Sequence, residues 1–253
     1  MLTSDPWLIC HRPNPGARLR LFCFPYAGGM ANIYRKWPEL LPRTVEVWAI
    51  QPPGRGSRFR EPPFTRLPDL TEQLVPALRS YLTRPFAFFG HSMGTHIGFE
   101  LARRLRRERL PGPLHLFVSG CRALQLKEDM PQTHLLPDAE FVAELRRLSG
   151  TPREVLEHPE LMQLLLPLLR ADFALTQIYQ YQEEPPLDCP ITAFGGWQDE
   201  EIDRASVEAW GKQTTAAFSS YMLPGDHFFL HTAERQLCEV IALKLERIVA
   251  GLA

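Results

Sequence analysis

An apolar run, Phe86–Phe89, leads directly into Gly90-His91-Ser92-Met93-Gly94, and a helical pattern follows. A Gly-x-Ser-x-Gly motif between a strand and a helix predicts a nucleophile elbow, a turn so sharp that its serine takes strained backbone angles. Glycines on both sides remove side chains that would collide where strand and helix approach. So short a pattern often occurs by chance, but the flanking strand and helix patterns argue against chance here. We therefore expect an α/β fold with Ser92 at the end of a strand.

Strand-like and helical patterns alternate along most of the chain. The apolar, strand-like runs are Leu19–Phe24, Val45–Gln51, Phe86–Phe89, Leu114–Ser119, Ile191–Phe194 and Phe218–Leu223. Helical spacing is predicted at about Leu70–Leu82, Met93–Arg109, Val207–Gln213 and Glu234–Val249. Nearly continuous apolar strands are typical of a sheet covered on both faces, so the alternation predicts a doubly wound, mostly parallel sheet. Ligands of such sheets bind beyond the carboxyl ends of the strands, where Ser92 is expected.

The alternation breaks between Arg122 and Pro186. This interval has helical patterns at Asp138–Leu148, with Asp138 as a possible N-cap, and at Pro159–Tyr181, but no convincing strand. We expect a helical insertion over the top edge of the sheet, a lid at about 122–186 within a single α/β domain of residues 1–253. An ordinary long crossover is the alternative.

Composition and motifs exclude several classes of protein. A net charge of −1 gives no reason to expect nucleic acid or an anionic membrane as partner, and no apolar run reaches the roughly 18 residues of a membrane span. The N-terminus lacks the regions of a secretory signal. Five scattered cysteines without Cys-x-x-Cys spacing favour a reduced, cytoplasmic protein. We expect a monomer. We expect no cofactor or metal either, because no metal-ligand cluster, phosphate-binding loop or Gly-x-Gly-x-x-Gly motif occurs.

A serine nucleophile needs a base to take its proton and a third group to orient that base. In this architecture the partners follow the serine in the order acid, then histidine. Asp199 lies just past the strand that ends at Phe194, and His227 lies in a glycine-containing loop after the strand that ends at Leu223. Both loops belong to one sheet edge, so we assign His227 as base and Asp199 as its orienting carboxylate. The competing residues, which are less well placed along the chain, are Glu200, Glu201, Asp203, Asp226, His91, His96 and His231.

Acyl transfer also requires backbone N–H donors that stabilise the developing oxyanion. One is expected from Met93, directly after the nucleophile, and the other from the loop after the first long strand. In that loop, Phe24-Pro25-Tyr26-Ala27-Gly28-Gly29, the proline ends the strand and the two glycines allow a tight turn. Ala27 is the expected donor and Tyr26 the second choice; the alternative is a plain strand-ending turn without such a role.

Five arginines crowd the end of the helix that follows the elbow: Arg103, Arg104, Arg106, Arg107 and Arg109. Basic side chains favour a helix C-terminus, so a solvated face is the expected role. A docking patch for an acidic partner is the alternative.

Five stretches together resemble the type II thioesterases of polyketide and non-ribosomal peptide synthesis, within the α/β-hydrolase fold. They span nearly the whole chain in the family's order: Phe24–Gly29, Gln51–Arg58, Gly90–Gly94, Leu169–Phe173 and Pro224–Phe229. The second and fourth are not general hydrolase features, which makes the resemblance specific. Two small departures are Pro52, where leucine is expected, and Asp226, where glycine is frequent.

The resemblance implies hydrolysis of acyl thioesters on the phosphopantetheine arm of acyl or peptidyl carrier proteins, in trans, to clear stalled or wrongly primed carriers. It also implies a role for each site residue: Ser92 as nucleophile, Asp199 and His227 as its partners, Ala27 and Met93 as oxyanion donors. For the interval 122–186, the resemblance implies a mobile helical lid over the acyl pocket. A carboxylesterase or lipase, an acyltransferase and a non-catalytic carrier-binding protein are the alternatives.

Overall fold

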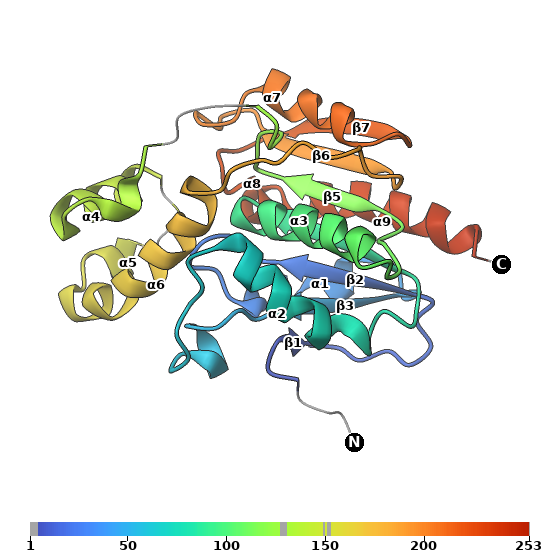
Figure 1. The fold of residues 1–253 in the computed structure, drawn as a ribbon, viewed down its shortest axis with the longest axis horizontal. Helices are drawn as coiled ribbons and strands as arrows, with labels where there is room; N and C mark the ends of the chain where they lie inside the picture. The colour runs from blue at the N-terminus through green and yellow to red at the C-terminus, as the bar shows by residue number, and fades with distance from the viewer. Residues whose placement is uncertain (1–4, 127–130, 149, 151–152, 253) are drawn as a thin grey trace.

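The computed structural model describes residues 5–126, 131–148, 150 and 153–252 (Figure 1). Within these residues one seven-stranded sheet has the order β1-β3-β2-β4-β5-β6-β7. Only β1 is antiparallel to its neighbour, and every other pair is parallel. The mostly parallel sheet that the sequence predicts is therefore confirmed. The strands are β1 (Leu8–Ile9), β2 (Leu19–Phe24), β3 (Val45–Ile50), β4 (Phe86–His91), β5 (Leu116–Ser119), β6 (Ile191–Gly196) and β7 (Phe218–Leu223).

The strands differ from the predicted ones mainly at glycines. β4 and β6 run farther than predicted, to His91 and Gly196. Glycines in a sequence suggest turns, but here the ladder continues through them, with Gly90 opposite Val118 and Gly195 opposite Met222. The edge strand β1 was not predicted, because two residues are too few to show an alternating pattern.

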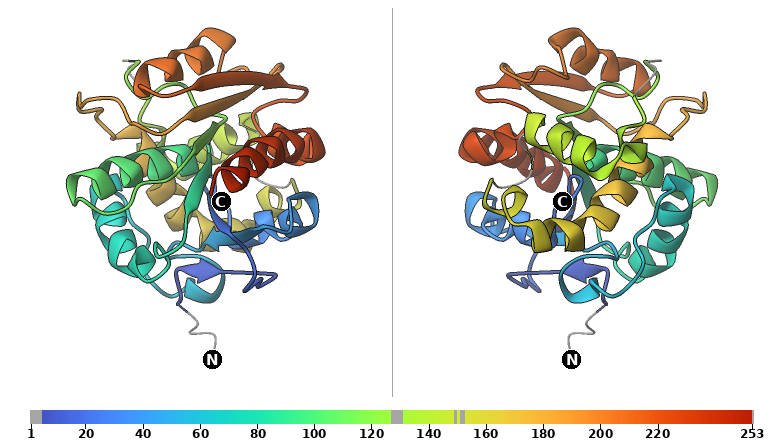
Figure 2. Two further views of the ribbon diagram at one scale, coloured as in Figure 1. Left: turned by 90° about the vertical axis from the view of Figure 1, so that its right-hand side faces the viewer. Right: turned by 90° about the vertical axis from the view of Figure 1, so that its left-hand side faces the viewer.

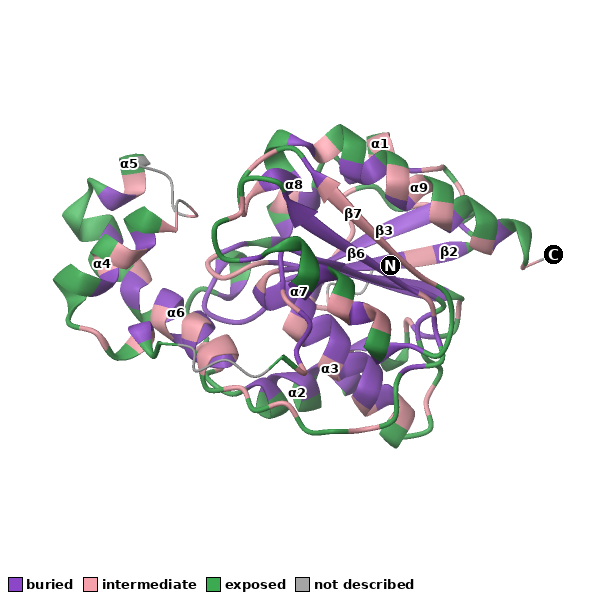
Figure 3. Ribbon diagram, turned by 90° about the horizontal axis from the view of Figure 1, so that it is seen from above, coloured by how far each residue is buried: buried purple, intermediate pink, exposed green. Residues whose placement is uncertain are grey.

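Helices cover both faces of the sheet, so the doubly wound prediction is confirmed (Figures 2 and 3). One apolar core joins the sheet to α2, α3 and α7, and a second joins the other face to α1, α8 and α9. The predicted helix Val207–Gln213 is instead α7 followed by a 3-10 helix at Ala209–Gln213. The helices are α1 (Trp37–Leu40), α2 (Leu67–Arg79), α3 (Met93–Arg107), α7 (Arg204–Glu208), α8 (Phe229–Thr232) and α9 (Glu234–Ala250).

Between β5 and β6 the chain forms α4 (Asp138–Arg147), α5 (Arg153–Leu156) and α6 (Pro159–Gln177), which extend beyond one end of the sheet in Figure 1. The three helices share a small apolar core of their own, built around Phe141 and Met162. Asp138 is not the N-cap of α4: Pro137 holds that place, and Asp138 forms an ion pair with Arg170 at 2.7 Å. In the part of the chain described here, no helix is long and apolar enough to cross a membrane.

The turn between β4 and α3 has the geometry that the motif predicts. Ser92 has φ 52° and ψ −116°, a strained conformation for a residue with a side chain. A Cβ atom on Gly90 would overlap the backbone of Gly94, and one on Gly94 would overlap the carbonyl group of Phe24. Strand, helix and the neighbouring β2 therefore approach each other backbone to backbone, and Ser92 stands at the end of the sheet.

Replacing Gly94 by alanine is expected to lower the free energy of unfolding by about 3 kcal/mol, because backbone atoms cannot move aside as a side chain can. Urea denaturation of the purified variant measures the change. Gly112→Ala is the matched control, since a Cβ there meets nothing within 4 Å, and its effect should stay within about 0.5 kcal/mol. Equal stabilities for the two variants would contradict the close packing of the elbow.

Four of the five arginines at the end of α3 form ion pairs within the chain. A solvated face is the wrong description of Arg103, which is 2% exposed. Glu184, beyond α6, receives Arg103, Arg106 and Arg107 at 2.9, 2.9 and 2.5 Å. Arg104 forms a further ion pair with Glu108 at 2.9 Å. These contacts hold the segment before β6 against α3. They also pair the arginine charges that would have to be available if this surface bound an acidic partner.

Glu184→Gln is expected to lower the free energy of unfolding at pH 7 by about 1–2 kcal/mol, since it removes the shared partner of three arginines. Burial raises the pKa of the Glu184 carboxyl, but the hydrogen bond from Arg106 and the charges of Arg103 and Arg107 outweigh it and hold the pKa below its usual value. A lowered folded-state pKa contributes stability above the unfolded value of about 4.3, and this is lost as the pH falls through the folded value.

The difference in unfolding free energy between wild type and Glu184→Gln should therefore shrink below about pH 4. Urea titrations at pH 7 and pH 3 test this, with Glu183→Gln, an exposed neighbour, as control. A difference that stays constant with pH would argue against the ion pairs as its source.

Candidate active site

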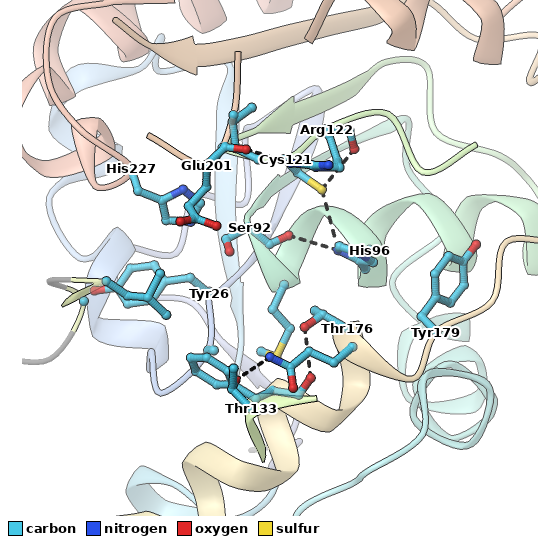
Figure 4. A pocket seen from close by; sticks show the side chains of 18 of the residues that line it. Tyr26, Ser92, His96, Cys121, Arg122, Thr133, Thr176, Tyr179, Glu201 and His227 are labelled. Carbon is cyan, nitrogen blue, oxygen red and sulfur yellow. Dashed lines mark hydrogen bonds between the residues drawn. The ribbon is translucent and has the colours of Figure 1, made fainter. Parts of the chain in front are cut away.

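A pocket of about 670 Å³ lies between the carboxyl edge of the sheet and the helices α4 and α6. Ser92 and His227 line it together with the predicted oxyanion donors Ala27 and Met93. Figure 4 shows Ser92 and His227 close together on one side of this pocket. The opposite wall comes from the helices between β5 and β6, through side chains such as Phe173. Residues from distant parts of the chain thus share one cavity at the sheet edge.

Asp199 and His227 are in direct contact. The Nδ1 atom of His227 lies 2.8 Å from Oδ2 of Asp199, whose side chain is fully buried. The other carboxylate oxygen accepts the backbone N–H groups of Glu201 and Ile202, at 2.9 and 3.2 Å. Because an ionised carboxylate only accepts hydrogen bonds, the proton of the neutral imidazole is on Nδ1, which leaves Nε2 free to act as a base.

Three backbone amides near Ser92 have no hydrogen-bond partner among the described residues. Among the described residues, the N–H groups of Tyr26, Ala27 and Met93 donate to no protein acceptor. All three residues line the pocket, and Met93 is the first residue of α3, where the helix dipole favours negative charge. Free N–H donors from two segments therefore converge on the cavity that contains Ser92. Both the expected donor Ala27 and its alternative Tyr26 retain a free amide.

The sequence did not indicate the contacts of His91. The side chain is fully buried, with Nε2 2.9 Å from the carbonyl oxygen of His227 and Nδ1 2.9 Å from Oγ of Ser119. Since a carbonyl only accepts, Nε2 donates and Nδ1 accepts from the serine hydroxyl. Burial holds the pKa of His91 well below its usual value, so the ring stays neutral. The hydrogen bond from His91, in the nucleophile elbow, thus holds the backbone of His227 in place.

Two further groups beside Ser92 are kept uncharged. Nδ1 of His96 lies 3.5 Å from the Ser92 carbonyl oxygen and 3.7 Å from Sγ of Cys121. Burial lowers the pKa of His96 to about 4 and raises the pKa of Cys121 to about 12. The Cys121 thiol is therefore protonated at neutral pH and does not compete with Ser92 as a nucleophile.

Three of the other competing residues have contacts of their own. Asp203 caps α7 by accepting the N–H of Ser206 at 2.8 Å, and Asp226 accepts the N–H of Phe228 at 2.8 Å. His231 lies on α8, and its Nε2 is 2.9 Å from the Tyr26 hydroxyl. Among the residues that can be described, no group of three or more potential ligands could hold a metal ion.

Comparison with known proteins is consistent with this geometry. Residues 19–245 match the thioesterase domain family. The chain is 49% identical to a protein of Brevibacillus parabrevis named linear gramicidin dehydrogenase LgrE, over 99% of this chain and 96% of that protein. It is 46% identical to the gramicidin S biosynthesis protein GrsT of Aneurinibacillus migulanus, over 97% and 96%. The solved structure of the type II thioesterase BorB from the borrelidin biosynthetic cluster has a TM-score of 0.87 at 37% identity, over 96% and 98%.

The name of the first relative describes a dehydrogenase, which the present sequence does not support. The chain has no Gly-x-Gly-x-x-Gly motif of a dinucleotide site. Its family match instead covers nearly all of the sheet and its helices.

Proposed function

The chain belongs to the thioesterase domain family, hydrolases of the α/β-hydrolase fold, and on this basis we propose that it is a type II thioesterase of a polyketide or non-ribosomal peptide pathway. Its substrate in this proposal is an acyl group on the phosphopantetheine arm of an acyl or peptidyl carrier protein. The name of GrsT, a gramicidin S biosynthesis protein, and that of BorB, a type II thioesterase from the borrelidin biosynthetic cluster, support the assignment. The observation that carries it is the hydrogen-bonded Asp199–His227 pair in one pocket with Ser92 and free amides.

In the proposed cycle, Oγ of Ser92 attacks the thioester carbonyl carbon while Nε2 of His227 takes the serine proton. The amides of Ala27 and Met93 donate to the oxyanion of the tetrahedral intermediate, and Asp199 stabilises the imidazolium. The C–S bond then breaks, and His227 returns the proton to the leaving pantetheine sulfur. Water, deprotonated by His227, attacks the acyl-serine, and the free acid leaves as Ser92 regains its proton. The cycle uses no cofactor.

We further propose that residues 122–186 act as a lid within one domain. One contact supports this role: Arg147, at the end of α4, forms an ion pair with Glu201 at 2.6 Å. Glu201 lies in the loop that begins with Asp199, so this ion pair links α4 to the loop that carries a site residue. The proposal also takes the chain to work as a monomer in the cytoplasm. All five cysteines are free thiols, which suits a reducing compartment.

Rates on matched substrates test the proposal against a carboxylesterase or an acyltransferase. Acyl-pantetheine and acyl-carrier thioesters are compared with the corresponding oxygen esters, with Ser92→Ala as the inactive control. Serine-dependent release of free acid, faster from carriers than from pantetheine, is expected. Preference for oxygen esters would indicate an esterase on the same scaffold. Acyl transfer to an added amine or alcohol in place of hydrolysis would indicate an acyltransferase.

A further inference from the structure

Two of the stretches that mark the family, Gln51–Arg58 and Leu169–Phe173, have no part in the cycle above, yet they meet in space. Arg55 follows β3, and Asp172 lies on α6, 117 positions later. Their side chains form a two-pronged ion pair, with Nη2 to Oδ1 at 2.6 Å and Nη1 to Oδ2 at 2.8 Å. Arg55 is 3% exposed and Asp172 is 0% exposed.

The same two side chains hold the backbone of the loop after β2. Oδ2 of Asp172 accepts the N–H of Gly28 at 2.7 Å, and Nη1 of Arg55 donates to the carbonyl oxygen of Gly29 at 3.2 Å. The Gly28 N–H and the Gly29 carbonyl group, just after Ala27, are thus each held by one side chain of the pair. The Ala27 amide, which lines the pocket, donates to no acceptor in the part of the chain that the structure describes.

Further contacts restrain the loop after β2 and the segment that contains Arg55. Gln51 donates from Nε2 to the carbonyl oxygen of Arg55 and accepts the N–H of Ala31 at Oε1, both at 2.9 Å. Gly28 has φ +75°, and a Cβ there would come within 2.7 Å of Leu169 on α6. The loop, the segment after β3 and α6 are therefore packed as one unit.

The stability of the fold does not account for such a pair. Removing two charges from water costs several kcal/mol per ion, and packed apolar side chains in their place often give equal stability. Nη1 of Arg55 and Oδ2 of Asp172 each make a second hydrogen bond, and both of these bonds go to the loop after β2. An oxyanion donor, by contrast, needs its N–H held within about 0.5 Å of the productive position.

We propose that Arg55 and Asp172 are positioning residues, which hold the loop after β2 so that the Ala27 amide faces the oxyanion. This rests on the proposed function, since it takes the oxyanion to form at Ser92. The pair is neutral overall, so the carboxylate anchors Gly28 without adding net negative charge beside the oxyanion. Because Asp172 belongs to α6, it also fixes one wall of the pocket to the loop.

A double variant, Arg55→Met with Asp172→Leu, removes the anchors while it keeps the core apolar and filled. The concentration of active enzyme is determined by active-site titration of Ser92. Per active site, kcat should fall about 10²-fold and KM should change less than about threefold. The affinity for an acyl trifluoromethyl ketone, which forms a tetrahedral adduct with the serine, should fall in parallel with kcat. A purely structural role would reduce the number of active sites but leave both quantities per site unchanged.

A control and a second variant sharpen the test. Arg20→Met with Glu46→Leu removes another poorly exposed ion pair, at the opposite end of β2, and should leave kcat per active site unchanged. If the first double variant does not fold, Arg55→Lys keeps the positive charge but lacks the planar fork that reaches both Asp172 and Gly29. Its kcat should fall about tenfold, with KM nearly unchanged.

Amide hydrogen exchange of the peptide that covers residues 24–31 measures how firmly the loop is held, and it needs no catalytic turnover. Faster exchange in the Arg55 and Asp172 variants, with wild-type exchange in the Arg20 and Glu46 control, is expected. Unchanged exchange, or a lower kcat without loss of ketone affinity, would overturn the positioning role. If the wild type hydrolyses no thioester, the proposed substrate fails, while ketone affinity and exchange still decide whether the pair positions the loop.

Discussion

Asp199→Asn should lower kcat by about 10⁴-fold, although it leaves the size and shape of the side chain unchanged. The backbone N–H groups of Glu201 and Ile202 donate to Oδ1 and would hold the amide oxygen of asparagine at that position. The amide NH₂ group then faces Nδ1 of His227, which must accept rather than donate. The imidazole proton moves to Nε2, and the base can no longer take the proton of Ser92.

Steady-state kinetics at pH 7 measure this effect, and ¹⁵N chemical shifts of His227 report which ring nitrogen carries the proton. Asp203→Asn is the matched control, because it lies in the same loop and caps α7, and asparagine caps helices equally well. Its kcat should equal that of the wild type. A kcat for Asp199→Asn within about tenfold of the wild type would remove Asp199 from the proposed triad.

Ser92→Ala should abolish covalent chemistry and lower kcat by about 10⁶-fold, leaving only the catalysis that the oxyanion donors and binding provide. The change removes a single oxygen atom, and alanine adopts the strained φ of 52° about as well as serine does. We therefore expect the variant to fold and to bind substrate with little change in affinity.

Intact mass after treatment with a fluorophosphonate gives a direct measurement. The wild type and Ser80→Ala, an exposed serine at the end of α2, should each gain one adduct, and Ser92→Ala should gain none. An adduct on Ser92→Ala, together with retained thioester hydrolysis, would show that another residue is the nucleophile.

Local patterns were sufficient for the fold and for the order of the candidate site residues. The glycines at 90 and 94 predict the sharp turn at Ser92, because the backbone contacts that exclude a Cβ are made next to the turn itself. The carboxyl ends of parallel strands meet at one edge, so short loops after β6 and β7 were enough to bring Asp199 and His227 together. These predictions depend on neighbours along the chain and on one rule of sheet geometry.

Pairings between distant side chains were decided only by the tertiary structure. The sequence drew attention to the stretches that contain Arg55 and Asp172, but it did not predict their ion pair. Nor did it predict the hydrogen bond from His91 to the carbonyl group of His227, 136 positions away. It also placed in solvent an arginine, Arg103, that pairs with Glu184. A charged or polar side chain has many candidate partners in a sequence. Which of them it meets depends on how the helices pack on the sheet, because burial makes an unpaired polar group costly and so selects its partner.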